Sequence, residues 1–222
     1  AVVLRHSDYG EADRLLTLSN ASVAQWVSYG IPASRVGRFT YWIDLNHFSP
    51  GERKASRALN NWDADALIVL FVGRLIPIKG ASVMIDLAHK HRDIRFVIVG
   101  EGPMEAEIWQ ATSTLPNLHF MGALANEALP DLYRGADVLL VPSQYEEGFG
   151  RVVCEALACG TPVIASRRGG LVEALEGSPG ILCADNAEAF SGALVEMRER
   201  LRTDPPLRDA CRAFAEARFG PP

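Results

Sequence analysis

Two glutamates, Glu147 and Glu155, stand eight residues apart where a glycine-broken loop runs into a helix predicted for Val152–Cys159. The first turn of a helix offers unpaired N–H groups and a positive dipole end, which suit an anion such as phosphate. Carboxylates beside such an anion would repel it, but they accept hydrogen bonds from hydroxyl groups. The combination therefore favours a sugar nucleotide over a bare nucleotide.

Two cations, Arg74 and Lys79, lie in a second loop, Gly73–Gly80, between a predicted strand and its helix. Arginine can hold two phosphate oxygens through its planar fork, whereas lysine acts as a mobile point charge. The alternative is a pair of surface cations, but positive charge at a helix start is unfavourable. A bound anion accounts better for both residues.

From Ala66 onward, short apolar strands alternate with amphipathic helices, which predicts a doubly wound parallel α/β sheet. Ligands bind such sheets at the carboxyl ends of the strands, where both loops would lie. The predicted strands are Leu67–Val72, Arg95–Val99, Leu118–Phe120, Val138–Val141, Pro162–Ala165 and Ile181–Cys183. The other predicted helices are Ala81–Lys90, Met104–Ser113, Asn126–Arg134, Leu171–Leu175, Ala187–Leu201 and Leu207–Arg218.

Glycines also follow the second and third predicted strands, at Gly102 and at Gly122, which comes directly after Met121. Glycine lets the backbone approach a ligand closely, and it equally serves a tight turn between strand and helix. Both interpretations stay open for these positions.

The frame EGFG…EALACGTPVIAS, with Glu147 and Glu155 in it, resembles the Glu-x7-Glu signature of retaining GT-B glycosyltransferases. The resemblance is to the group 1 family, of glycogen-synthase and mannosyltransferase type, and to its Rossmann-like C-terminal domain. It implies transfer of a hexose from a nucleotide-diphosphate sugar with retention of configuration. It implies no cofactor and no dedicated metal, because the nucleotide sugar is itself a substrate.

The same resemblance assigns roles along the chain. The diphosphate would be held by Arg74 and Lys79, which with Glu147 form the expected catalytic set. Glu147 would bind hydroxyls of the donor sugar and Glu155 those of the ribose. The remaining expected donor contacts are Gly102, Met121 and Gly122 around the nucleotide, and backbone groups of Phe149 and Gly150.

Two positions depart from the family pattern. Arg151 stands where an aliphatic residue is usual, and it can either pair with Glu155 at i, i+4 or face solvent. Tyr41–Asp44 replaces the usual Pro-Asn-Gly-Val-Asp turn between domains. The connection between the two domains is therefore expected to be unusual here.

The predicted organisation has three parts: residues 1–48 as the tail of an N-terminal acceptor domain, 49–65 as a linker, and 66–222 as a C-terminal domain truncated at its end. Predicted strands Arg14–Ser19 and Val36–Asp44 flank a helix capped by Asn20 or Ser22. We expect an excised piece of a longer protein that binds donor but transfers little. With its covering domain missing, the segment 14–43 is expected to associate with a second copy or partner fragment, or to be poorly ordered.

Composition excludes several other classes. The 222 residues carry a net charge of −5, which argues against nucleic acid as the main partner, and no apolar run is long enough to span a bilayer. The four cysteines lack metal-ligand spacing, which indicates buried thiols in a cytoplasmic protein, with peripheral attachment at the inner face of the membrane left open. Asp63–Asp65 precedes a strand, so turn chemistry is favoured over a metal motif, and the five histidines are interpreted as surface or turn residues.

Two other functions remain. Nonhydrolysing sugar-nucleotide epimerases share the fold, and a nucleotide-sugar-binding module that has lost activity would keep part of the site. The Glu-x7-Glu frame together with the Gly73–Gly80 loop favours the transferase.

Overall fold

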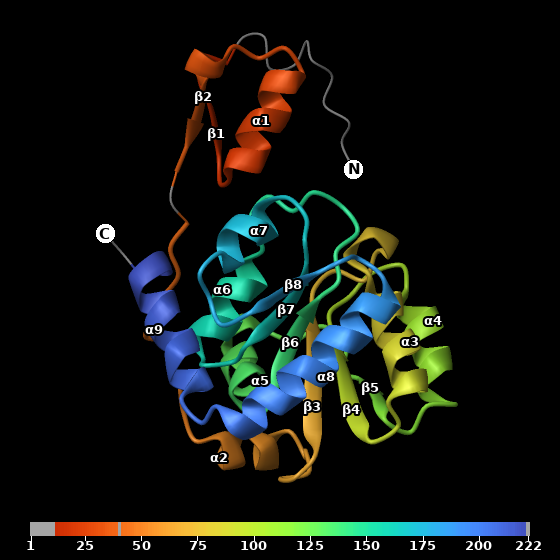
Figure 1. The fold of residues 1–222 in the computed structure, drawn as a ribbon. Helices are drawn as coiled ribbons and strands as arrows, with labels where there is room; N and C mark the ends of the chain where they lie inside the picture. The colour runs from red at the N-terminus through yellow and green to blue at the C-terminus, as the bar shows by residue number, and fades with distance from the viewer. Residues whose placement is uncertain (1–11, 40, 221–222) are drawn as a thin grey trace.

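A computed structural model of the chain describes residues 12–39 and 41–220. Residues 1–11, Thr40 and residues 221–222 lie outside the described residues, and with them His6 and parts of the predicted first and last segments. Figure 1 shows a small N-terminal unit above a larger α/β domain. The two are joined by the connecting segment that follows β2 (Val36–Arg38).

The larger domain is built on a parallel six-stranded sheet in the order β5-β4-β3-β6-β7-β8, within the described residues. This confirms the predicted doubly wound sheet. The order reverses between β3 and β6, and the loops at the carboxyl ends of these two strands diverge to leave a crevice for ligands. The strands are β3 Leu67–Val72, β4 Ile94–Val99, β5 Leu118–Phe120, β6 Val138–Val141, β7 Val163–Ser166 and β8 Ile181–Cys183.

Helices cover both faces of this sheet (Figure 1). Side chains alternate along each strand, so Ile68 and Leu70 enter one core with α5, α6, α7 and α9, and Val69 and Phe71 enter the other with α3, α4 and α8. The buried face of the sheet thereby fixes the strand ends that carry the site. The helices are α3 Ala81–Lys90, α4 Glu105–Thr112, α5 Leu129–Gly135, α6 Arg151–Ala158, α7 Gly170–Leu175, α8 Ala187–Thr203 and α9 Leu207–Phe219.

The segment expected to be a linker, 49–65, contains a helix, α2 (Arg53–Leu59). Its anchor is the buried guanidinium of Arg57, which donates to the Gly135 carbonyl at 2.9 Å and to Asp137 Oδ2 at 2.6 Å. Hydrophobic periodicity does not predict this helix, because its main anchor is a paired charge. The segment is a packed part of the larger domain, and this differs from the expected linker.

The N-terminal unit consists of β1 (Leu15–Thr17), α1 (Asn20–Ser28) and β2, with the two strands parallel. Helix α1 is capped by Ser19, whose Oγ accepts from Ser22 N at 3.1 Å. Strand β2 is shorter than the predicted Val36–Asp44. The chain leaves the unit and joins the larger domain, where Ile43 N donates to the Phe219 carbonyl at 3.1 Å. Residues 43 and 48, predicted within the tail, are buried in the larger domain's core.

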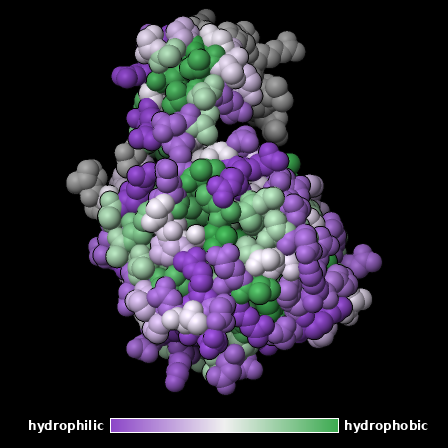
Figure 2. Space-filling view, in the orientation of Figure 1, coloured by the Kyte–Doolittle hydropathy of each residue, from purple (hydrophilic) through white to green (hydrophobic). Residues whose placement is uncertain are grey.

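Large apolar side chains remain exposed on or beside the N-terminal unit. Leu16, Tyr29 and Trp42 are 63%, 56% and 58% exposed. Figure 2 shows hydrophobic residues gathered on the face of this unit that it displays. Leu16 and Trp42 therefore leave apolar surface uncovered in the segment 14–43.

The cysteines and the helices of the described residues bear on the other sequence expectations. All four cysteines are free thiols, and burial raises the pKa of Cys159 and of Cys211 to about 12. Within 12–39 and 41–220, no three His, Cys, Asp or Glu side chains are grouped so as to hold a metal ion. In the same residues no helix has the length and apolar character that a membrane crossing requires.

Candidate functional site

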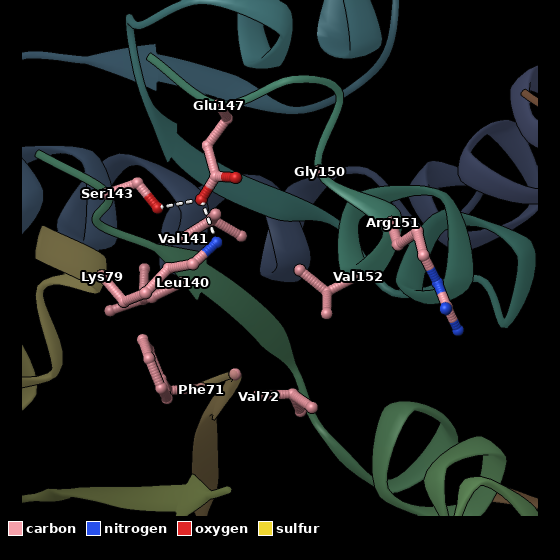
Figure 3. A pocket seen from close by; sticks show the side chains of 11 residues that line it. Phe71, Val72, Lys79, Leu140, Val141, Ser143, Glu147, Gly150, Arg151 and Val152 are labelled. Atoms are coloured by element: carbon pink, nitrogen blue, oxygen red, sulfur yellow. Dashed lines mark hydrogen bonds and ion pairs between the residues drawn. The ribbon is translucent and has the colours of Figure 1, made fainter. Parts of the chain in front are cut away.

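A pocket of about 250 Å³ opens at the carboxyl ends of β3 and β6, at the point where the strand order reverses (Figure 3). Its floor is apolar and comes from the two strands, while its polar groups come from the Gly73–Gly80 loop, the loop after β6 and the start of α6. The lining residues are Phe71, Val72, Gly73, Lys79, Leu140, Val141, Ser143, Glu147, Gly150, Arg151 and Val152. The sequence motifs around Gly73–Gly80 and Glu147 thus meet in one cavity.

Glu147 is the best-partnered polar group of the pocket. Its Oε1 accepts from Lys79 Nζ at 2.6 Å and from Ser143 Oγ at 2.5 Å, and its Oε2 accepts from Tyr145 Oη at 2.8 Å. Burial raises the pKa of Tyr145, so that its hydroxyl stays protonated and donates. In Figure 3 Lys79 and Glu147 point toward one another across the cavity. A buried carboxylate and a partly shielded ammonium therefore form an ion pair in the pocket.

The main chain of Glu147 is held by the turn before α7. Gly170 N donates to the Glu147 carbonyl at 2.7 Å, and a Cβ on Gly169 would lie 2.6 Å from that same oxygen. Gly169 also has a φ of 48°, a conformation that side chains other than glycine rarely adopt. Gly169 and Gly170 thus fix the loop that carries Glu147.

Helix α6 begins at the rim of the pocket. Gly150 precedes it with a φ of 82°, and a Cβ there would meet Leu171 Cδ2 at 2.6 Å. The amides of Arg151 and Val152 belong to the first turn, where N–H groups have no partner inside the helix. Together with Lys79 they supply positive potential beside the cavity, which suits an anion.

A second pocket, of about 210 Å³, adjoins the first, since Val72 and Gly73 line both. It contains Arg74, which is exposed and forms no hydrogen bond or ion pair within the part of the chain that the structure describes. The two expected diphosphate cations therefore lie in adjacent pockets on either side of Gly73. The second pocket is lined by Val72, Gly73, Arg74, Val99, Gly100, Glu101, Ala123, Leu124 and Leu129.

Three expected nucleotide contacts do not line these pockets. Gly102 is held by its own turn, because a Cβ would lie 2.6 Å from the Leu75 carbonyl oxygen and its N–H donates to Glu105 Oε1 at 2.9 Å. Met121 packs against the core, and Gly122 accepts a hydrogen bond from Gly100 N at 2.8 Å. Ala123 and Leu124, directly after them, are the residues that reach the second pocket.

Glu155 differs from Glu147 in its surroundings. It is buried in α6, where Tyr133 Oη donates to Oε2 at 2.8 Å and Arg151 Nη2 donates to Oε1 at 3.2 Å. Burial, followed by the charge of Glu155, holds the pKa of Tyr133 well above its usual value, so Tyr133 remains a donor. Of the two alternatives open for Arg151, the structure has the pair with Glu155. Any ribose contact to Glu155 would have to pass this arginine.

The side chain of Phe149 packs where the segment that connects the two parts of the molecule meets α9. Its ring lies 5.4 Å from that of Tyr41 and 5.8 Å from that of Phe219, measured between centroids. Phe149 is therefore directed at the connecting segment and α9, and it does not line the pocket that contains Lys79 and Glu147. The unusual Tyr41–Asp44 turn takes part in this packing.

The remaining sequence motifs are structural. Asp63 Oδ1 accepts from Asp65 N at 2.9 Å, which is the turn chemistry predicted there. His91 contacts Ser191 Oγ at 2.8 Å at the end of α3. His119 lies half-buried in strand β5, so its assignment to the surface or a turn is wrong.

Sequence reasoning missed the donors that hold the two glutamates. Ser143 and Tyr145 lie four and two residues before Glu147, in the loop after β6, and their polar character next to an expected acid was the available signal. Tyr133 comes from α5, twenty-two residues before Glu155, and no local spacing connects the two. The site therefore has more of its polar residues in the loop after β6 than the motifs alone indicate.

Comparison with known proteins identifies the family. Residues 52–218 match the family model described as glycosyl transferases group 1. A D-inositol 3-phosphate glycosyltransferase of Mycolicibacterium smegmatis is 36% identical over 196 residues, covering 84% of this chain and 42% of that protein. A relative named D-inositol 3-phosphate glycosyltransferase 2, from Catenulispora acidiphila, is 34% identical, covering 82% of this chain and 48% of its own length. The chain spans less than half the length of these curated relatives.

Solved structures agree with this assignment. The Anabaena protein Alr3699/HepE in complex with UDP-glucose superposes with a TM-score of 0.86 at 25% identity, over 96% of this chain and 62% of that one. Sucrose-phosphate synthase from Thermosynechococcus elongatus superposes with a TM-score of 0.83 at 30% identity, over 96% of this chain and 56% of that one. The parallel sheet, the loops gathered at its switch point and the sequence match lead to one conclusion: this chain belongs to the glycosyl transferases group 1 family.

Proposed function

We propose that this chain is the donor-binding part of a glycosyltransferase that takes a sugar from a nucleotide-diphosphate sugar. The observation that carries the proposal is the meeting of Lys79, the start of α6 and Glu147 in one pocket. The cation and the helix amides suit a phosphate, and the carboxylate suits sugar hydroxyls. A structural neighbour that binds UDP-glucose supports this choice of ligand class.

In this proposal Arg74 and Lys79 bind the diphosphate from the two adjacent pockets, with Gly73 between them. As the bond between sugar and diphosphate breaks, negative charge develops on the leaving phosphate. Lys79, Arg74 and the first turn of α6 stabilise that charge without a dedicated metal or cofactor. These residues thereby raise the rate of donor cleavage.

Glu147 accepts hydrogen bonds from the donor sugar, and Gly150 faces the sugar and phosphate, with the backbone of Phe149 directly before it in the chain. Glu155 serves the ribose once Arg151 gives way. The loop with Met121 and Gly122 faces the base through its continuation at Ala123 and Leu124, and Gly102 supports the Gly73–Gly80 loop by packing against Leu75. We propose retention of configuration on the basis of the Glu-x7-Glu frame.

The boundaries proposed for the intact protein follow the same scheme. Residues 1–48 close an acceptor domain and 66–222 form the donor domain, and the segment 49–65 contains α2, which packs on α5 of the larger domain. The acceptor domain is the proposed partner, and the chain by itself would transfer little. A cytoplasmic location remains part of the proposal.

Calorimetric titration with UDP, GDP and ADP tests the proposal directly. We expect one of them to bind, and Arg74→Ala and Lys79→Ala each to weaken it about tenfold, since a charge-assisted phosphate contact contributes roughly 1.5–3 kcal/mol. Lys90→Ala is the matched control, because Lys90 is an exposed cation on the same helix–loop unit, paired with Glu188. Binding that is unchanged in both pocket variants would remove the diphosphate assignment.

A sugar-nucleotide epimerase is the second candidate, because it would use the same nucleotide pocket. The chain is incubated with a sugar derivative of the nucleoside diphosphate that binds, and the configuration of its sugar is followed by NMR. This experiment distinguishes the epimerase from the transferase. The proposal predicts an unchanged nucleotide sugar, whereas conversion to its epimer would favour the alternative.

A further inference from the structure

The carboxylate of Glu147 is nearly saturated by donors from its own chain. A carboxylate offers about four acceptor positions, and three are taken by Lys79, Ser143 and Tyr145. A donor sugar with two hydroxyls to place would find one position left. A sugar that donates two hydroxyls to this carboxylate therefore requires one of the three protein donors to leave.

Lys79 is the donor that can leave. Its side chain is 19% exposed and ends a flexible stem of four carbons, so its ammonium can move without the backbone. Its main chain is fixed, because Lys79 N donates to the Ile76 carbonyl and a Cβ on the next residue, Gly80, would lie 2.0 Å from the Pro142 oxygen. The pocket that would hold the phosphate lies directly beside the ammonium.

Ser143 and Tyr145 cannot follow in the same way. Ser143 is buried and its short side chain comes from the end of β6, next to Glu147. Tyr145 carries its ring beneath the Lys79 ammonium, 4.9 Å from the ring centroid, and gives its hydroxyl to Glu147. The Glu147 backbone is clamped by Gly170 at 2.7 Å. The carboxylate stays in place while the ammonium moves.

We propose that Lys79 changes partner on donor binding, from the Glu147 carboxylate to the donor phosphate, and that Ser143 and Tyr145 are positioning residues that hold the vacated carboxylate toward the sugar. This inference rests on the proposed donor site. It makes the Lys79–Glu147 pair a competitor of the phosphate (Figure 3). Nucleotide and sugar are thereby coupled, because the phosphate frees the acceptor position that the sugar hydroxyl needs.

The exchange predicts that removing the charge of Glu147 raises the affinity for the nucleoside diphosphate. Glu147→Gln leaves a side chain of the same shape but no longer holds Lys79 by an ion pair. The nucleoside diphosphate without sugar should then bind about threefold or more tightly, the size expected from a partly shielded pair. The nucleotide sugar should lose this gain, because its sugar hydroxyls meet an amide in place of the carboxylate.

A double-mutant cycle tests the exchange itself. Calorimetry with the nucleoside diphosphate that binds wild type is run on wild type, Glu147→Gln, Lys79→Ala and the double variant. We expect Glu147→Gln to tighten binding only when Lys79 is present, because the cycle isolates the coupling of the two side chains. Equal tightening in the Lys79→Ala background would mean simple repulsion between carboxylate and phosphate, and would overturn the exchange.

The positioning role has its own readout. Ser143→Ala and Tyr145→Phe should each leave affinity for the nucleoside diphosphate within about twofold and weaken its sugar nucleotide several-fold, since each removes one hydrogen bond to Glu147. In the Glu147→Gln background the two substitutions should have little further effect on the sugar nucleotide. Additive losses there, or equal losses for both ligands, would contradict positioning through Glu147.

The two levels fail differently. If UDP, GDP and ADP all fail to bind wild type, the proposed function falls and this inference falls with it. If one binds and depends on Lys79, but Glu147→Gln leaves its affinity unchanged or lower, the proposed function stands and the exchange is wrong.

Discussion

The N-terminal unit and the six-stranded domain are built from the same strand–helix pattern, yet they differ in whether a leucine in a strand is buried. Leu16 in β1 is 63% exposed, whereas Leu70 in β3 is fully buried. The six-stranded domain has helices on both faces of its sheet, but the described part of the N-terminal unit has two short strands, one α-helix and one short 3-10 helix. A sheet of two strands has too few neighbours to bury its apolar side chains. The comparison teaches that the six-stranded domain has a core of its own, whereas the described part of the N-terminal unit leaves apolar side chains exposed.

One carboxylate joins the two regions. Glu173, on α7, accepts hydrogen bonds from Asn20 N at 2.9 Å and Ala21 N at 3.0 Å, and Arg38 lies 3.4 Å from it. It caps the first turn of α1 from another part of the chain, where negative charge is favourable. Helix α7 itself starts at Gly170, the glycine that clamps Glu147. The surface of α7 that contacts the N-terminal unit therefore lies next to the loop that carries Glu147.

The largest difference should come from one substitution made in both regions. Leu70→Ala should lower the free energy of unfolding by about 2–5 kcal/mol, because it opens a cavity in a closed core. Leu16→Ala should change it by less than about 0.5 kcal/mol, as for other exposed positions. Urea unfolding followed by thiol labelling measures the Leu70→Ala loss, since all four cysteines lie in the six-stranded domain, and hydrogen exchange in Leu15–Thr17 measures the Leu16→Ala change. A large loss from Leu16→Ala would show that β1 is covered in solution.

A smaller effect is expected at the junction. Glu173→Gln keeps an acceptor for the α1 amides but removes the charge, so α1 should open more easily by about 1 kcal/mol, or roughly fivefold. Hydrogen exchange in Asn20–Ser28 is the measurement, with thiol labelling as evidence that the larger domain stays folded. Glu176→Gln is the matched control, because Glu176 is an exposed acid at the end of the same helix. Faster exchange in the control would mean that net charge, and not the cap, holds α1.

Much of the fold could be predicted because strand periodicity and loop glycines act locally. The six strands of the larger domain and the helices between them follow from apolar runs bounded by turn residues. The failures have physical causes. Helix α2 is anchored by the ion pair of Arg57 with Asp137, and an ion pair leaves no apolar periodicity in the sequence. Strand β2 is shorter than predicted because Ile43 packs in the core of the larger domain.

The sequence predicted the motifs of the site but not the side-chain pairs that form within it. Lys79 and Glu147 were expected in one cleft, and Lys79 Nζ lies 2.6 Å from Glu147 Oε1, but the sequence does not reveal that the two side chains pair with each other. Nor does it show that Arg151 covers Glu155, since i, i+4 spacing allows both pairing and exposure. Such pairings depend on side-chain geometry between elements, whereas a motif fixes only residue types and order.

Hydrogen exchange with and without the bound nucleoside diphosphate tests the central claim most directly, because it reads both regions in one experiment. The account predicts slower exchange in residues 73–80 and 147–153, where the cations and the start of α6 meet the phosphate. It predicts no change in β1 or β2 of the N-terminal unit. Saturating nucleotide that leaves 73–80 and 147–153 unchanged, or protects the N-terminal unit alone, would contradict it.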